Sequence, residues 1–293
     1  MTTISSLATT ENSLVAFIKR HPVVSMSIMT LVFAWPGLIW ETLYSRGLVV
    51  SQSPIILSLL IGWVPGIAAV AVTAMLAGRA GVRPLLRRFL IWKVGVQWYL
   101  VGFFLLAIII LGGMVLHVLF GSAMPVIPAA ESALWEIALS FLILIVVGGL
   151  LNTEEIAWRG FALPRLQSRY GVLLAGVLVA IPESLLHLPY FWNKDVEFYQ
   201  NVGIFWFTAF SIAMIFIYIF VFNKTKGSLL IVTLMHASQN AWANLLSDNT
   251  IRPFQFTVAL AWMIMLALIF LTKGQLGYES EQMQSPSVKG VMK

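Results

Sequence analysis

The feature that most constrains the fold of this chain is a recurring apolar run long enough to cross a lipid bilayer. A span needs roughly 20 apolar residues, because an α-helix rises about 1.5 Å per residue and the hydrocarbon core is about 30 Å thick. Hydrophobic residues make up 59% of the chain and charged residues only 10%, whereas a soluble domain carries about 25% charged residues. The sequence therefore predicts a polytopic membrane protein.

Eight such segments predict an all-α bundle of about eight transmembrane helices. They cover residues 23–44, 54–76, 97–120, 132–151, 172–189, 202–222, 227–246 and 254–272. Their continuous apolarity indicates helices, because the strands of a membrane barrel alternate apolar and polar positions. Residues 14–277 are predicted to form a single membrane domain between polar tails at residues 1–13 and 278–293.

The positive charges are distributed unevenly between the predicted loops. If the chain crosses the membrane eight times, 15 of its 18 Lys and Arg residues lie on the side of the termini, and Arg46, Lys194 and Arg252 lie on the other side. Lys and Arg concentrate in cytoplasmic loops, so both termini are predicted to be cytoplasmic, with the plasma (inner) membrane as the expected location. The net charge of +6 is then explained by topology and membrane lipid, and no nucleic-acid partner is expected.

One basic segment, residues 78–93, mixes arginines with apolar residues. This pattern is typical of an amphipathic helix that lies on the cytoplasmic leaflet, where anionic lipid attracts its positive charges.

Three segments in or directly after the predicted spans carry ionisable or strongly polar side chains at membrane depth. A charge at the bilayer centre costs about 2.5–3.5 kcal/mol, so such groups need partners or a function. The groups are Glu154, Glu155 and Arg159; Glu183 and His187; and His236 and Asn240. Residues four apart share one helix face, which predicts a Glu155–Arg159 ion pair and places His236 and Asn240 side by side.

We expect the fourth helix to continue to about residue 168 and to turn at residues 170–171. Glu154 and His187 are equally far from that turn, so an antiparallel hairpin would place them next to each other. Taken singly, each group is also compatible with a helix cap, a helix end or a hydrogen bond between helices. Their agreement in depth favours a shared site.

These residues resemble the motifs of the CPBP (CAAX protease and bacteriocin-processing) family of intramembrane proteases, in particular the type II CAAX prenyl endopeptidases. The matching residues are Glu154, Glu155 and Arg159 for EExxxR, His187 for FxxxH, and His236 and Asn240 for HxxxN. The similarity covers about residues 130–245. The second motif departs from the family pattern, because Glu183 stands where the family has Phe. We expect Glu183 to form a hydrogen bond with His187.

The resemblance implies an endopeptidase that cleaves a membrane-associated or prenylated (CAAX-type) protein. It implies that Glu154 activates the water with help from His187, and that His236 and Asn240 stabilise the oxyanion. Glu155 and Arg159 would organise the site. The expected partners are a membrane protein or lipidated peptide as substrate, together with membrane lipid.

The chemistry of these side chains leaves two mechanisms open. No cofactor is expected, because a carboxamide such as Asn240 is a poor zinc ligand and a good oxyanion donor. Zinc held by His187, His236 and Glu154 is the alternative. The chain has no cysteine, which excludes thiolate chemistry.

Two other classes of function remain open at this point. A transporter or ion relay could use the same polar groups, although they converge at one level and no inverted repeat is visible. A non-catalytic immunity or scaffold protein could retain the family fold, and the sequence does not separate it from an active protease.

Overall fold

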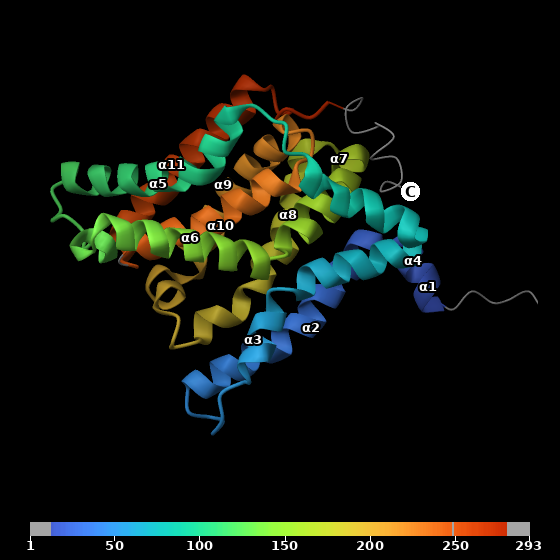
Figure 1. Ribbon diagram of the computed structural model, residues 1–293, viewed down its shortest axis with the longest axis horizontal. Coiled ribbons are helices and arrows are strands. Elements are labelled where there is room, and N and C mark those ends of the chain that lie inside the picture. The colour runs from blue at the N-terminus through green and yellow to red at the C-terminus, as the bar shows by residue number, and fades with distance from the viewer. Residues whose placement is uncertain (1–12, 248, 280–293) are drawn as a thin grey trace, which may run out of the picture.

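The computed structural model describes residues 13–247 and 249–279, and within these ranges the regular structure is entirely helical (Figure 1). The predicted all-α polytopic membrane fold is confirmed. Five helical segments of the described residues are long and apolar enough to cross a membrane. They are α2 (Pro22–Ser45), α4 (Val64–Arg87) with the short helix η1 (Arg88–Leu90), α5 (Val96–Leu119), α9 (Glu197–Lys224) and α11 (Ile251–Leu271). The two predicted polar tails lie almost entirely outside the described residues.

The remaining predicted spans also coincide with helices, namely α6 (Leu134–Leu151), α8 (Val172–Leu186) and α10 (Leu229–Leu246). These three are shorter or less apolar than a full span, so the number of eight crossings stays a prediction. The second predicted span is interrupted, because α3 (Ile55–Ile61) ends one residue before Gly62 and α4 begins only at Val64.

The helices form two groups with a central segment between them (Figure 1). One group contains α5, α6, α9, α10 and α11, and the other contains α2, α3 and α4 together with the short α1 (Ser13–Arg20). The central segment contains a π-helix, η3 (Ile156–Ala162), followed by α7 (Leu163–Tyr170) and α8. The π-helix contacts α2, α4, α7, α8 and α10, so its side chains lie where the two groups meet.

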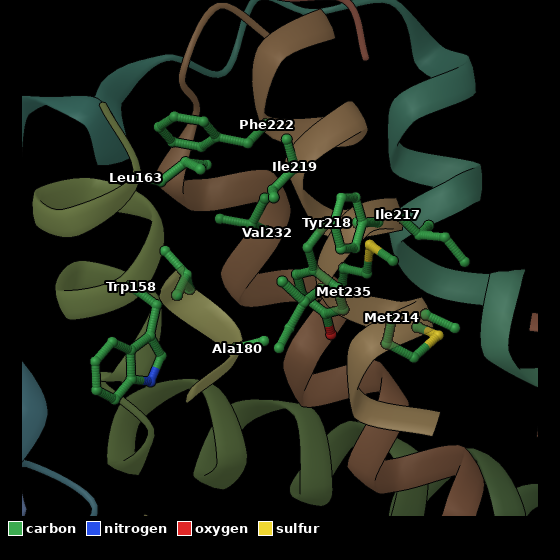
Figure 2. Packing of buried hydrophobic residues seen from close by; sticks show 14 of the residues in the cluster. Trp158, Leu163, Ala180, Met214, Ile217, Tyr218, Ile219, Phe222, Val232 and Met235 are labelled. Carbon is green, nitrogen blue, oxygen red and sulfur yellow. The ribbon is translucent and has the colours of Figure 1, made fainter. Parts of the chain in front are cut away.

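Apolar side chains pack around this central region. Trp158 and Phe161 of the π-helix are fully buried. Figure 2 shows Leu163 and Phe222 at one end of the cluster, with Tyr218 and Met235 between α9 and α10. The packing fixes the π-helix, and with it the polar side chains that the helix carries.

The fourth helix does not continue to residue 168, as the sequence had suggested. The α6 helix ends at Leu151, Asn152 has an extended conformation (φ −98°, ψ 108°), and the chain then enters the π-helix. The expected turn between α7 and α8 is confirmed at Gly171, whose φ of 78° is a conformation that glycine adopts readily.

Candidate active site

Thr153 fixes the break after α6 against the start of α4. Its hydroxyl donates to the carbonyl of Gly62 (2.9 Å) and accepts from the amide of Gly66 (3.0 Å). A Cβ atom on Gly66 would lie 2.5 Å from Cβ of Thr153, so this close approach requires glycine. Through Thr153, the start of α4 therefore positions Glu154 and Glu155, the next two residues of the chain.

Asn152 connects the break to α10. Its Oδ1 accepts a hydrogen bond from the backbone amide of Glu154 (2.9 Å), which orients the carboxamide so that Nδ2 faces His236 Nε2 (2.9 Å). His236 Nε2 is then the acceptor, and the ring proton lies on Nδ1, which donates to Glu155 Oε1 (2.9 Å). Both ring nitrogens of His236 are thus engaged.

Asn152 was not among the predicted site residues. The available signal was its place directly after an apolar helix. There, an Asn side chain often bonds to the backbone two residues further on.

Arg159 is the centre of a buried charge network. Its Nη1 lies 3.3 Å from Glu155 Oε1 and 2.7 Å from Glu183 Oε1, and only 1% of the residue is exposed. The predicted Glu155–Arg159 pair is therefore confirmed. The guanidinium also lies 4.6 Å from the centre of the Tyr218 ring, and the Tyr218 hydroxyl donates to Gln239 (3.2 Å).

The prediction of a hydrogen bond between the Glu183 carboxylate and His187 was wrong. The carboxylate binds Arg159, and the backbone carbonyl of Glu183 accepts from His187 Nδ1 (2.9 Å). Because a carbonyl can only accept, Nδ1 carries the proton and Nε2 of a neutral His187 is free to accept one. The rings of Tyr190, Tyr199 and Phe207 surround this imidazole, with centroids 5.3–6.3 Å away.

Glu154 has other hydrogen-bond partners than Glu155 and Arg159. Its Oε2 accepts a hydrogen bond from Trp158 Nε1 (3.2 Å), and the carboxylate is close enough to His187 and His236 to interact with both electrostatically. The structure thus brings together a carboxylate and two imidazoles from the break after α6, the end of α8 and the middle of α10.

A cavity of about 630 Å³ opens beside these groups. Its polar lining includes Glu155, Arg159, Glu183, His187, His236 and Asn240, and its apolar lining includes Tyr199, Phe207, Phe210, Met214 and Phe254. Glu154 is not among the lining residues. Asn240 is exposed to the cavity, and its carboxamide has no hydrogen bond to another described residue.

The zinc alternative does not fit this arrangement. Among the described residues, no group of three or more His, Asp or Glu side chains is arranged to hold a metal ion. His236 has no nitrogen left for a metal, because Glu155 and Asn152 occupy both.

Comparison with known proteins gives one family match for this chain. A family model described as type II CAAX prenyl endopeptidase Rce1-like matches residues 133–242. None of the curated proteins compared with the chain matches it significantly. The matched segment contains the break after α6, the π-helix, α7, α8, α9 and most of α10. Residues 133–242 therefore carry a domain of the Rce1-like type II CAAX prenyl endopeptidase family of membrane proteases.

Proposed function

We propose that this protein is an intramembrane endopeptidase that hydrolyses a peptide bond of a membrane-associated or lipidated (CAAX-type) protein. The observation that carries the proposal is that His187, His236 and Asn240 line one cavity, with both imidazoles oriented by hydrogen bonds. Glu154 is tied to this group through Asn152, which accepts from the Glu154 amide and contacts His236. Glu154, His187 and His236 come from three separate segments of a membrane-protease domain. The two histidines line a cavity large enough for a peptide and water.

In this proposal Glu154 is the general base. Its carboxylate takes a proton from a water molecule while the oxygen of that water attacks the substrate carbonyl carbon. The Nε2 atom of His187 accepts a hydrogen bond from the same water, since its Nδ1 proton is committed to the Glu183 carbonyl. When the C–N bond breaks, the proton held by Glu154 passes to the leaving amine.

Asn240 is the proposed oxyanion donor, because its carboxamide lies in the cavity without a partner among the described residues. We assign His236 a positioning role rather than the oxyanion role implied by the family resemblance. Its only ring proton is directed at Glu155, and its other nitrogen accepts from Asn152. Glu155 and Arg159 keep that imidazole in place.

The test is a comparison of cleavage products in native membranes. Membranes that contain the wild-type protein should yield new protein N-termini that are missing when Glu154→Gln replaces it. A Gln275→Ala variant, changed at an exposed amide away from the cavity, should give the wild-type pattern. Identical product patterns for wild type and Glu154→Gln would contradict the proposal.

A further inference from the structure

A buried arginine lies at the end of α4, outside the candidate active site. Arg88 is the first residue of η1, and only 2% of it is exposed. Its Nη1 donates to the carbonyl of Gly227 at 3.3 Å. Its Nε and Nη2 atoms are also buried, and they have no hydrogen-bond partner among the described residues.

The two unpartnered nitrogens form one edge of the guanidinium. Nε–H and Nη2–H point in the same direction, and this edge binds two oxygens of a phosphate or carboxylate in parallel. A buried charge without a counter-ion is strongly unfavourable. A buried donor without a partner needs an explanation, and a bound ion or water is one that also neutralises or solvates the charge. The geometry of Arg88 thus matches an oxyanion.

The described residues around Arg88 supply positive charge and no ion-pair partner. Within residues 13–247 and 249–279, no ion pair involves Arg88. The neighbouring ionised group is Arg165, which is close enough to repel it. Arg165 donates to the carbonyl of Phe161 (2.9 Å), and Arg88 lies 5.4 Å from the ring of Phe222. These two guanidinium groups contact backbone carbonyls and aromatic rings.

The position along the chain indicates the source of the anion. Gly78 (φ 55°) breaks α4, and the helix that follows exposes Arg79, Arg83 and Arg87 to solvent. The next residues expose Leu90 and Trp92, by 71% and 58%. Arginine, leucine and tryptophan exposed together are typical of the membrane interface, where the phosphates of lipid headgroups lie.

We propose that the Nε–Nη2 edge of Arg88, with Arg165 beside it, binds a phosphate group, supplied by an anionic phospholipid or by free inorganic phosphate. This site is independent of the proposed protease activity. A bound phosphate supplies the missing counter-ion and fastens the end of α4 to the loop that precedes α10.

The test measures thermal unfolding of the full-length protein, stripped of lipid in a neutral detergent. The three ligands are phosphatidylglycerol, diacylglycerol with the same acyl chains, and inorganic phosphate. Phosphatidylglycerol should raise the unfolding temperature and diacylglycerol should not. A rise with inorganic phosphate alone would identify free phosphate as the source. An equal response to diacylglycerol would overturn the proposal.

Variants at Arg88 separate this site from general charge attraction. Arg88→Gln should weaken the response to the phosphate ligand by roughly tenfold or more, since it removes a charge-assisted bidentate contact. The response of Arg88→Lys to the phosphate ligand should lie between those of the wild type and Arg88→Gln, because lysine keeps the charge but lacks the Nε–Nη2 edge. Arg83→Gln, an exposed arginine of the same segment, should respond like the wild type.

A control for misfolding follows from the same geometry. Without ligand, Arg88→Gln should unfold at a temperature no lower than the wild type, because the substitution removes an uncompensated buried charge. If Arg88→Gln does not fold, Arg88→Lys carries the test. A wild-type response of either variant to the phosphate ligand would overturn the proposal.

Discussion

The ion pair between Glu183 and Arg159 allows a quantitative prediction. The two groups meet at 2.7 Å, and their side chains are 12% and 2% exposed. Breaking a buried pair outright costs about 3–5 kcal/mol, but Arg159 keeps a second carboxylate, Glu155, at 3.3 Å. Glu183→Gln should therefore lower the free energy of unfolding by only about 1.5–3 kcal/mol, the value of one charge-assisted hydrogen bond.

A double-mutant cycle measures this interaction directly. The free energy of unfolding would be determined in detergent for wild type, Glu183→Gln, Arg159→Gln and the double variant. The two changes should be coupled by at least about 1 kcal/mol, since the residues share a direct contact. Glu197→Gln, at an exposed carboxylate, serves as the matched control and should show no coupling to Arg159→Gln.

The same variant tests whether Glu183 acts on His187. Because its carboxylate binds Arg159 and only its backbone carbonyl contacts His187, Glu183→Gln should leave the pH profile of cleavage unchanged. Additive effects on unfolding would refute the ion-pair argument. A shifted pH profile of cleavage would instead indicate that the Glu183 carboxylate contacts His187 directly, as the sequence suggested.

Three further predictions concern the site. Gly66→Val should lower both stability and cleavage, because the valine side chain would collide with Thr153 and displace Glu154 and Glu155. Wild-type stability and cleavage would contradict the role of this contact. Asn240→Ala should lower kcat by a factor of about 10² to 10³ with little change in KM, as expected for an oxyanion donor, and a pure KM effect would indicate substrate binding instead. Strong chelators should leave cleavage intact, and a loss that stoichiometric zinc restores would make His187 and His236 metal ligands.

The helices were predictable because apolar runs of span length leave few alternatives in a bilayer. The Glu155–Arg159 pair followed from four-residue spacing on one turn, which depends only on local geometry. The break at Asn152 and Thr153 was not predictable in the same way. It is held by Gly62 and Gly66, which are far away in the sequence and adjacent only after α4 packs against the π-helix.

The partner of Glu183 illustrates the same limit. A spacing of four residues permitted a contact with His187, and that local contact was expected. The observed partner, Arg159, is 24 residues away, and the packing of α8 against the π-helix selects it. The engagement of both His236 nitrogens likewise depends on Asn152, whose side-chain direction is set by the break.

The most direct test is to measure, in liposomes, how fast purified Glu154→Gln hydrolyses a peptide that the wild-type protein cleaves. The substitution keeps the size of the side chain and removes the base. If Glu154 is the base, cleavage is lost while the unfolding temperature and substrate binding stay near wild type. Glu183→Gln, changed at a carboxylate that lines the cavity, should retain cleavage. Full turnover by Glu154→Gln would contradict the assignment of this carboxylate as the water-activating base.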